Sequence, residues 1–316
     1  MKHLKAFLQL IRWPNLVFIV IAQGLFQWAV ILPVYEHAQV PANLAGANLW
    51  WLMLASVCIA AAGNIINDYF DLNIDRVNKP EKVVIDKFVR RRWAIIWHLL
   101  LSGIGIGISF YLDTTSSIAL LGWANTMCVV LLFVYSITLK KKLLIGNIVI
   151  SLLTAWVILV VPFAESSQLL RQSALDVQKI TRLSLLYGAF AFIISLIREV
   201  VKDIEDIDGD RRYGCKTMPI VWGIQASKIF TATWLVMLIT TLIAVQLYVL
   251  TFGWWLSALY CVVAIIIPCL QSLMQLKRAF SPNDFHALSS RIKLVMLTGI
   301  LSMMFFRWYV SDVLFM

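Results

Sequence analysis

The sequence predicts an all-α integral membrane protein with about nine transmembrane helices, and three observations lead to this prediction. Hydrophobic residues make up 61% of the 316 positions, and the mean hydropathy is +0.83. Charged residues make up only 14%, and apolar runs of about 20 residues recur along the whole chain. Because a bilayer satisfies no backbone hydrogen bonds, and because the runs are continuous rather than alternating, they indicate helices and not a β-barrel.

Nine spans are expected, and the first of them is not followed by a small-residue cleavage site, so it should be retained and not removed as a signal peptide. Pro14 suits the first turn of this span, and Arg12 and Trp13 suit the membrane interface. The approximate spans are 14–34, 48–70, 93–112, 117–138, 144–164, 183–202, 229–250, 253–275 and 294–312.

The basic residues are distributed unevenly between the two ends of these spans. The N-terminal tail, the connections after spans two, four, six and eight, and the end of span six (Arg198 and Lys202) carry all of the 27 lysines and arginines except Arg171, Lys179, Arg182 and Arg307. This positive-inside asymmetry predicts an inner-membrane protein with its N-terminus in the cytoplasm and its C-terminus outside. It also accounts for the net charge of +10 without a nucleic-acid partner.

The second span leads into a group of carboxylates, Asp68, Asp71 and Asp75. Together with Asn67 they fall within an arc of about 100° on a helix. Like charges at this spacing repel, and the negative end of the helix dipole adds to the cost. The loop Val34–Asn48 before this span has no basic residue and is expected outside.

The sixth span leads into the same spacing of carboxylates, Asp203, Asp206 and Asp210. On one continuous helix they share a narrow face, whereas Glu205 and Asp208 point elsewhere. Each group alone is compatible with a solvated helix end, but two groups of equal spacing predict a cation between them. Magnesium is expected, because its preferred ligands are oxygen atoms, and the five scattered cysteines and four histidines show no soft-metal or disulfide pattern.

Spans two and six run in the same direction and end alike, which predicts a parallel repeat within a single domain, residues 1–316. Its halves are roughly 14–142 and 144–275, and the last span, 294–312, is an extra helix. The two carboxylate groups would then face each other across a pseudo-twofold axis along the membrane normal. Spans seven to nine carry few polar residues and are expected to form lipid-facing walls.

Several polar and basic residues near the carboxylates are candidates for substrate binding. Arg76 and Lys79 are the nearest cations of the loop after span two, and they could hold phosphate oxygens or only be solvated. Tyr135 and Asn147, with Ser151 and Thr154, could join helices or line a substrate chamber. Arg198, Glu199 and Lys202 are charged groups close to a span, which is costly unless they pair or serve a site. The outer loop Glu165–Arg182 is expected to be polar and to contain a short surface helix.

These elements fit an amphiphilic ligand. A diphosphate would bind between the carboxylate groups through magnesium, which neutralises the departing charge, and a hydrocarbon tail would lie among the apolar helices. The simplest ligand that suits both parts is a lipid with a diphosphate head.

The two acidic motifs resemble the markers of the UbiA superfamily of intramembrane prenyltransferases, NDxxDxxxD and DxxDxxxD. Here they read Asn67-Asp68-Tyr-Phe-Asp71-Leu-Asn-Ile-Asp75 and Asp203-Ile-Glu-Asp206-Ile-Asp-Gly-Asp210. The resemblance implies magnesium-dependent ionisation of an allylic prenyl diphosphate, followed by attack of a lipophilic acceptor on the carbocation. It implies that Asn67, Asp71, Asp75, Asp206 and Asp210 hold the magnesium–diphosphate, and that Asp68 and Asp203 assist metal binding or act on the acceptor proton. Asp68, Asp71, Asp203 and Asp206 form the expected catalytic set, and Lys140 or Lys141 matches the family's basic residue after the fourth helix.

The acceptor is suggested by three further segments, which are most similar to the branch that transfers a geranylgeranyl group from its diphosphate to geranylgeranylglyceryl phosphate in ether-lipid synthesis. These segments are Asn78-Lys-Pro80, Leu144-Ile-Gly-Asn147 and Arg198-Glu-Val-Val-Lys-Asp-Ile-Glu-Asp206. One departure concerns an expected contact with the head group or the diphosphate. Many members continue after Asn-Lys-Pro with a segment like Arg-Pro-Ile-Pro-Ser-Gly, whereas this chain has Glu81-Lys-Val-Val-Ile-Asp-Lys87.

Other functions stay open from the sequence. Within the family, the alternative is aromatic prenylation in quinone biosynthesis, with 4-hydroxybenzoate or 1,4-dihydroxy-2-naphthoate as acceptor. A phosphate-bearing acceptor should require more cations around its head than an aromatic one. A secondary transporter is a more distant alternative. Transporter sites usually lie near the bilayer midplane at broken helices, whereas these carboxylate groups are expected at helix ends near the membrane interface. A CDP-alcohol phosphotransferase is disfavoured because its DGxxAR signature is absent.

Overall fold

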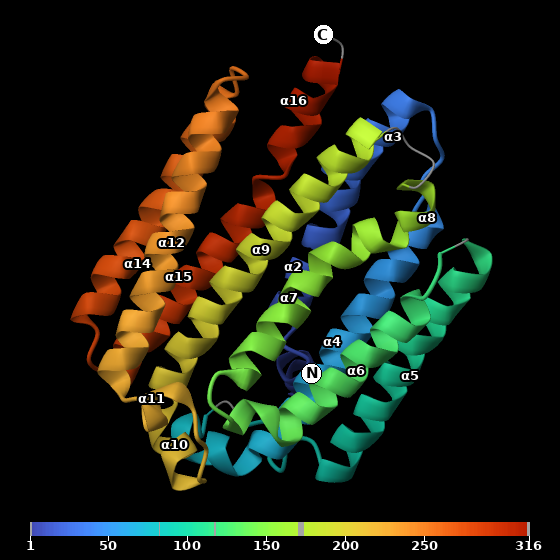
Figure 1. Cartoon of the computed structure of the whole chain (residues 1–316). Helices are drawn as coiled ribbons and strands as arrows, with labels where there is room; N and C mark the ends of the chain where they lie inside the picture. Colours follow the sequence, from blue (N-terminus) through green and yellow to red (C-terminus); the bar gives the residue numbers. More distant parts are fainter. Residues whose placement is uncertain (1, 82, 117, 170–173, 315–316) are drawn as a thin grey trace.

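The computed structural model describes residues 2–81, 83–116, 118–169 and 174–314, and it is a bundle of long helices (Figure 1). The first half of the chain contains α1 (Lys2–Leu10), α2 (Trp13–Phe26), η1 (Gln27–Ile31), α3 (Leu32–Ala38), α4 (Ala47–Asn78), α5 (Arg91–Thr115), α6 (Leu121–Ile137) and η2 (Leu139–Lys141). The second half contains α7 (Ile145–Ala164), α8 (Ser166–Leu169), α9 (Ala174–Glu205), α10 (Ile207–Arg212), α11 (Met218–Val221), α12 (Ile224–Leu250), α13 (Trp255–Cys261), η3 (Val262–Ile266), α14 (Ile267–Arg278), α15 (Pro282–Leu301) and α16 (Met304–Leu314).

The prediction of an all-helical membrane protein is confirmed. Among the described residues, eight helical stretches are long and apolar enough to cross a membrane. The predicted fourth span is the shorter apolar helix Leu121–Ile137, which has 17 residues. Its predicted start, residue 117, lies outside the described residues. The eight stretches are Trp13–Ala38, Ala47–Asn78, Arg91–Thr115, Ile145–Ala164, Val177–Glu205, Ile224–Leu250, Trp255–Arg278 and Pro282–Tyr309.

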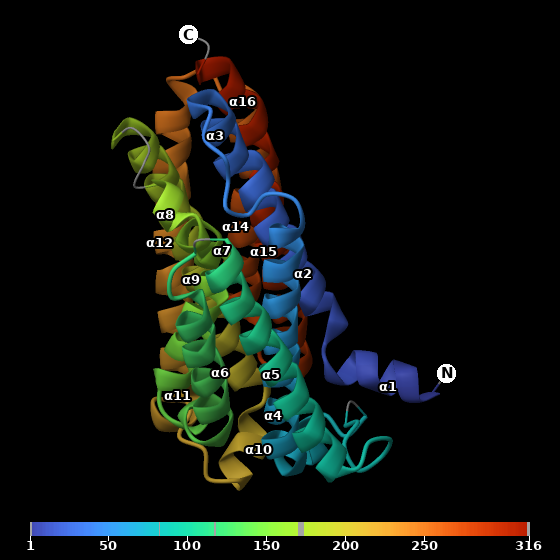
Figure 2. The same cartoon turned by 90° about the vertical axis from the view of Figure 1, so that its right-hand side faces the viewer.

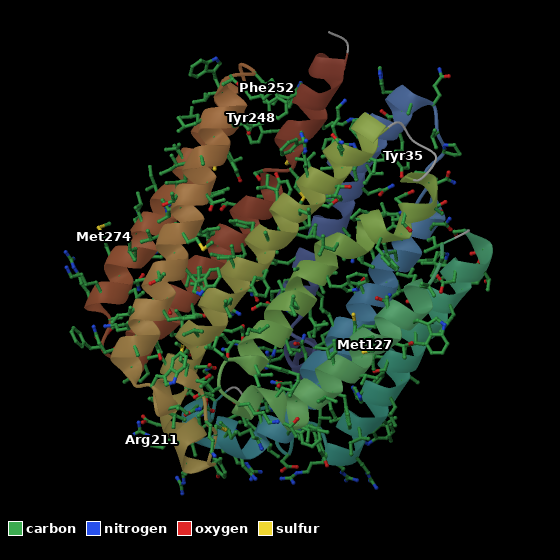
Figure 3. The ribbon with its side chains drawn as sticks, in the orientation of Figure 1. Tyr35, Met127, Arg211, Tyr248, Phe252 and Met274 are labelled. Atoms are coloured by element: carbon green, nitrogen blue, oxygen red, sulfur yellow. The ribbon has the colours of Figure 1, made fainter. Side chains whose placement is uncertain are left out.

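The outer surface of the bundle is apolar, as a lipid-facing surface must be. Met127, Tyr248, Phe252 and Met274, labelled in Figure 3, are each more than half exposed. Figures 1 and 2 place the two chain termini at opposite ends of the bundle, with α1 projecting sideways from the N-terminal end. Arg211, on α10, lies at that same end (Figure 3).

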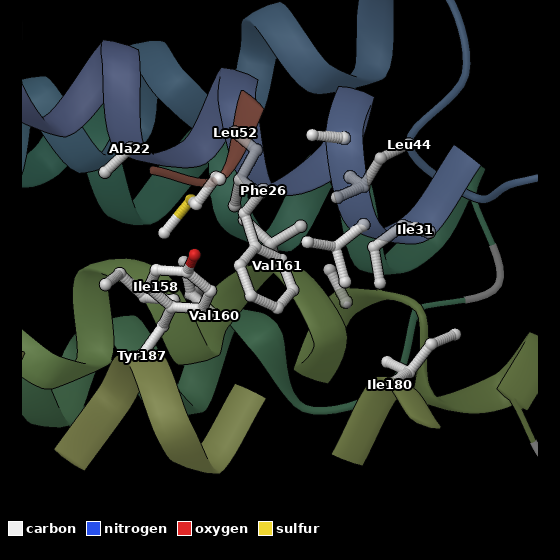
Figure 4. Close-up of a cluster of buried hydrophobic side chains, with 14 of the residues drawn as sticks. Ala22, Phe26, Ile31, Leu44, Leu52, Ile158, Val160, Val161, Ile180 and Tyr187 are labelled. Carbon is white, nitrogen blue, oxygen red and sulfur yellow. The ribbon is translucent and has the colours of Figure 1, made fainter. Parts of the chain in front are cut away.

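The core is divided into packed groups of apolar side chains. One group joins α2, η1 and α3 to α4, α7 and α9 through residues such as Phe26, Leu52, Val161 and Tyr187 (Figure 4). A second joins α9, α12, α14 and α15, and a third packs α1 and the loop 83–85 against α4 and α5. Burial of such side chains against several helices fixes how α4, α7 and α9 stand relative to one another.

The loops after α3 and α7, at one end of the bundle, are connected by a buried carboxylate, although the sequence predicted a polar surface segment there. Glu165 follows α7 and is fully buried. Its carboxylate accepts hydrogen bonds from the backbone N–H groups of Asn43 (2.9 Å) and Leu44 (2.9 Å) and from Gln27 Nε2 (3.1 Å). The expected short helix is α8, and Arg171 lies outside the described residues.

Both acidic motifs start on long helices that extend past the predicted spans. The helix α4 continues through the first motif to Asn78, whereas the span was predicted to end at residue 70. The second motif is interrupted: α9 ends at Glu205, and Asp206 precedes α10. The prediction that Asp203, Asp206 and Asp210 share the face of one continuous helix is therefore wrong.

The side chain of Asn78 accounts for this interruption. Its Nδ2 donates to the carbonyl oxygen of Asp206 (2.9 Å), and its Oδ1 accepts from the backbone N–H of Gly209 (2.8 Å). The Gly209 N–H thus bonds to a side chain and not to a backbone carbonyl, whereas the carbonyl oxygen of Asp206 also accepts from the Asp210 N–H (3.2 Å). A Cβ on Gly209 would lie 2.5 Å from Asn78, so glycine allows this approach. The parallel repeat and the domain limits stay predictions.

Candidate active site

A cavity of about 990 Å³ lies inside the bundle, between α2, α4, α6, α7, α9 and α15. Charged side chains line it where α4 and α9 approach their C-terminal ends. Apolar side chains continue it into the bundle, among them Leu132, Leu153, Val157, Phe190 and Ile194. The cavity is therefore charged at one end and mainly apolar along the rest, with a few uncharged polar side chains such as Ser56, Asn125 and Thr154, which suits an amphiphile.

Almost every predicted site residue lines this cavity, and the structure brings both acidic motifs together there. The lining includes Asn67, Asp68, Asp71, Asp75, Lys79, Tyr135, Lys140, Lys141, Asn147, Arg198, Lys202, Asp203, Asp206 and Asp210. Arg76 is the exception: it bonds to Asp86 (2.8 Å) in the loop after α4 and lies outside the cavity lining.

The first motif is held by cations from other elements. Asn67 Nδ2 donates to Asp71 (2.8 Å), and Lys140 of η2 forms an ion pair with Asp71. Arg12, just before α2, donates to Asp68 (2.6 Å), and the charge of Asp68 raises the pKa of Arg12. Asp68 and Asp71 are thus each neutralised by a residue that is distant in sequence.

The second motif is held in the same way. Lys79 Nζ donates to Asp206 (2.7 Å) and also lies 3.2 Å from Glu205. Burial lowers the pKa of Lys79, but the charges of Asp206 and Glu205 outweigh this effect, and the pKa is above its usual value. Asn147 Nδ2, on α7, donates to Asp203 (2.8 Å). The sequence left open whether Asn147 joins helices or lines a chamber. In the structure it joins α7 to α9 and also lines the cavity.

Carboxylates remain in excess in this part of the cavity. Burial, together with the charges of Asp206 and Asp71, raises the pKa of Asp210 to about 7. Within the described ranges, no three His, Cys, Asp or Glu side chains are close enough to hold one metal ion; lysine ammonium groups contact the carboxylates instead. The donor chemistry nevertheless fits a magnesium ion, because carboxylate and amide oxygens on two walls of one cavity are its preferred ligands.

The segment 81–87 departs from the resembled family, and its described residues 83–87 lie outside the cavity lining. Val83, Val84 and Ile85 are buried against α1, α4 and α5. Asp86 has a positive φ of 69° and accepts from Arg76 and Arg91, which closes the loop. The residues in place of the expected segment therefore support α4 from behind the motif.

Sequence reasoning missed three contributors to the site. Arg12 was assigned only to the interface, and Asn78 was noted without a role. Lys293, on α15, lines the cavity, together with Ser289, Met296 and Ile300. The expectation that the last spans only face lipid is wrong for α15, which begins at Pro282 and not near residue 294. Ser289, Lys293, Met296 and Ile300 recur at helical spacing, and this stripe with one lysine could have indicated that α15 lines a site.

Comparisons with known proteins agree with this geometry. The UbiA prenyltransferase family model matches residues 31–297. The chain is 34% identical over 212 residues to digeranylgeranylglyceryl phosphate synthase of Methanothermobacter thermautotrophicus, covering 66% of this chain and 67% of that one. It is 32% identical over 250 residues to the enzyme of the same name from Methanospirillum hungatei, covering 78% and 81%.

Solved structures share the fold. A structure described as digeranylgeranylglyceryl phosphate synthase has a TM-score of 0.59 and 22% identity, covering 96% of this chain and 99% of that chain. A UbiA homolog from Archaeoglobus fulgidus, bound to DMAPP and Mg²⁺, has a TM-score of 0.60 and 14% identity, covering 94% and 98%.

Proposed function

Because this chain belongs to the UbiA prenyltransferase family, we propose that it transfers a geranylgeranyl group from geranylgeranyl diphosphate to geranylgeranylglyceryl phosphate. In this reaction the bond between C1 of the geranylgeranyl group and the diphosphate oxygen breaks. A bond forms between C1 and the free glyceryl hydroxyl oxygen, and the hydroxyl proton is released. The products are digeranylgeranylglyceryl phosphate and diphosphate.

One observation carries the proposal more than any other. Two carboxylate clusters, from α4 and from the α9–α10 junction, line the charged part of a cavity that is otherwise apolar. A diphosphate with magnesium matches the charged part, and a long isoprenoid chain matches the rest. The two relatives described above support the choice of acceptor, since both are digeranylgeranylglyceryl phosphate synthases.

Asn67, Asp71, Asp75, Asp206 and Asp210 would hold magnesium. Bound there, the ion would neutralise the diphosphate oxygens as negative charge develops on them. The side chains of the protein add to this stabilisation. Lys79 and Lys140 pair with Asp206 and Asp71 and are placed to contact the same diphosphate.

Asp68 and Asp203 are the remaining carboxylates of the two motifs, and one of them would accept the hydroxyl proton of the acceptor. Asp68 is held by Arg12, and Asp203 is held by Asn147, so each has a fixed orientation. Tyr135 also lines the cavity, close to the charges of Glu199, Asp203 and Asp71. The apolar walls exclude water, which would otherwise capture the carbocation.

The membrane orientation belongs to the same proposal. The loops at the α10 end of the bundle carry most of the basic residues, so this end would face the cytoplasm, with the N-terminus inside. The prenyl diphosphate would then enter from the cytoplasmic side of the inner membrane.

A paired assay tests the proposal. Purified protein with Mg²⁺ and radiolabelled geranylgeranyl diphosphate would receive geranylgeranylglyceryl phosphate in one tube. The other tube would receive 4-hydroxybenzoate with 1,4-dihydroxy-2-naphthoate. Transfer to the glyceryl phosphate alone is the expected result, whereas transfer to an aromatic acid alone would move the protein into quinone synthesis.

Gly146 provides a test of how the lysine near Asp71 is positioned. An added Cβ would lie 2.7 Å from Cα of Lys140 and 2.8 Å from the carbonyl oxygen of Leu139, and backbone atoms cannot swing aside. Gly146→Ala should therefore displace Lys140 and lower kcat/KM about tenfold or more.

The matched control is Gly103→Ala on α5, where an added Cβ meets nothing within 4 Å. Its activity should stay within about twofold of the unmodified protein, since alanine suits a helix better than glycine. Equal activity of the two variants would show that the position of Lys140 does not matter for turnover.

A further inference from the structure

Two neighbouring helices change from apolar to basic where they line the cavity. On α9, Phe190 and Ile194 are followed by Arg198 and Lys202 at helical spacing, and all four line the cavity. The helix α15 packs against α9 and runs in the opposite direction (Figure 1). On α15, Lys293 lies toward the charged part of the cavity, and Met296 and Ile300 follow it along the apolar part. The two stripes therefore present cations next to a continuous apolar surface.

Positive charges gather on this wall, and the carboxylates near them are Glu199 beside Arg198 and Lys202, Asp203 beside Lys202, and Asp68 on Arg12. The charged groups that act on the Lys293 ammonium are Arg198, Arg12 and Lys202, and all three are positive. Lys293 donates to a neutral partner, Asn15 Oδ1 (2.6 Å). Glu199 lies between Arg198 (3.1 Å) and Lys202 (3.2 Å) and can neutralise only one of them.

The side chain of Arg198 provides a second, independent observation that points to a ligand. Its Nε is buried and has no hydrogen-bond partner in the part of the chain that the structure describes. A buried donor without a partner is costly, and a planar guanidinium is suited to bind phosphate oxygens in a bidentate manner. The side chain lines the cavity, so a ligand there could accept this bond.

We propose that Arg198, Lys202 and Lys293 form a second anion site, which binds the phosphate of the acceptor lipid. This inference rests on the proposed function and adds to it the place where the acceptor is held. The first anion site, for the donor diphosphate, belongs to Lys79 and Lys140 beside the two acidic motifs. Two separate sites keep the two anionic head groups apart.

The apolar continuation of the two stripes explains why a lipid phosphate is chosen over a free phosphate or a small aromatic acid. The hydrocarbon tail of the acceptor would pass along Met296, Ile300, Phe190 and Ile194 while its phosphate stays at Lys293. Neither a free phosphate nor a benzoate would cover this surface. The glyceryl hydroxyl lies within a few bonds of the phosphate, so binding here brings it toward the acidic motifs.

Lys293→Met tests the site, because it keeps the apolar stem and removes the charge. The Michaelis constant for geranylgeranylglyceryl phosphate should rise about tenfold or more, while that for geranylgeranyl diphosphate should stay within about twofold. Lys293→Arg should restore most of the affinity. Lys277→Met, at an exposed position on α14, is the matched control and should change neither constant.

A second acceptor separates a phosphate contact from a structural effect. Geranylgeranylglycerol lacks the phosphate, so the unmodified protein should use it poorly, and Lys293→Met should lose most of this preference. Binding of each acceptor without donor or magnesium, followed by protein thermal shift, gives the same comparison without turnover.

Each result can be assigned. If the unmodified protein uses only aromatic acids, the proposed function fails, and the site fails with it. If it uses geranylgeranylglyceryl phosphate but Lys293→Met leaves its Michaelis constant and thermal shift unchanged, the function stands and the second anion site is overturned. A rise in both Michaelis constants that Lys293→Arg does not reverse would also overturn it, as a sign of a structural role.

Discussion

Replacing Asp71 or Asp206 by alanine is expected to lower kcat/KM by roughly 10³-fold while leaving a folded protein in the membrane. The two residues come from different helices and are held by Lys140 and Lys79, at the charged part of the cavity. Each alanine would remove a carboxylate from the proposed magnesium–diphosphate site. Asp71→Asn should be equally inactive, because it keeps the volume of the side chain but removes its charge and one of its two acceptor oxygens.

Asp208→Ala is the matched control for these variants. Asp208 lies between Asp206 and Asp210 in sequence, but it is exposed and is absent from the cavity lining. It should retain nearly full activity. Turnover and a monodisperse elution profile would be measured for all four variants, and full activity of Asp71→Ala or Asp206→Ala would refute the site. So would full activity of the unmodified protein in EDTA.

Replacing Glu165 by alanine is expected to cause the largest loss of stability of any single substitution considered for this protein. The carboxylate is fully buried and accepts from Asn43, Leu44 and Gln27. Removing it leaves three buried donors unsatisfied, at a cost of about 1 kcal/mol or more for each. The loss should total roughly 3 kcal/mol and appear as a Tm several degrees lower in detergent.

Glu36→Ala is the control at the same end of the bundle. Glu36 pairs with Arg307 (3.1 Å), but its side chain is 58% exposed. An exposed ion pair contributes about 1 kcal/mol at most, so its Tm should change little. Equal Tm values for the two variants would show that the buried carboxylate does not hold the loops after α3 and α7 together.

Much of the candidate site could be predicted from sequence because its spacing is local. Asn67, Asp68, Asp71 and Asp75 are helical in the structure, so a helical wheel describes them correctly. The second motif could not be derived in this way. Its helix breaks at Asp206 because Asn78, far away in sequence, supplies the hydrogen bonds there.

The basic residues around the site could not be predicted from local sequence patterns either. Arg12 and Lys293 approach the site only because α2 and α15 pack beside α4 and α9. The same holds for Glu165. Its neighbours in the sequence are polar, and its burial depends on residues 43–44, which fold over it. The periodicity of the sequence does not predict these long-range contacts.

The sequence by itself determined that the chain is an all-helical membrane protein and that two groups of carboxylates stand at helix ends. Hydrophobic runs of membrane length and i, i+3 and i+4 spacing are local properties, and the physics of bilayer and helix acts on them directly. Only the tertiary structure decided that Lys79 and Lys140 neutralise these carboxylates and that Asn78 breaks the second helix. It also decided that α15 contributes a cation to the cavity, since such contacts depend on how helices distant in sequence pack together.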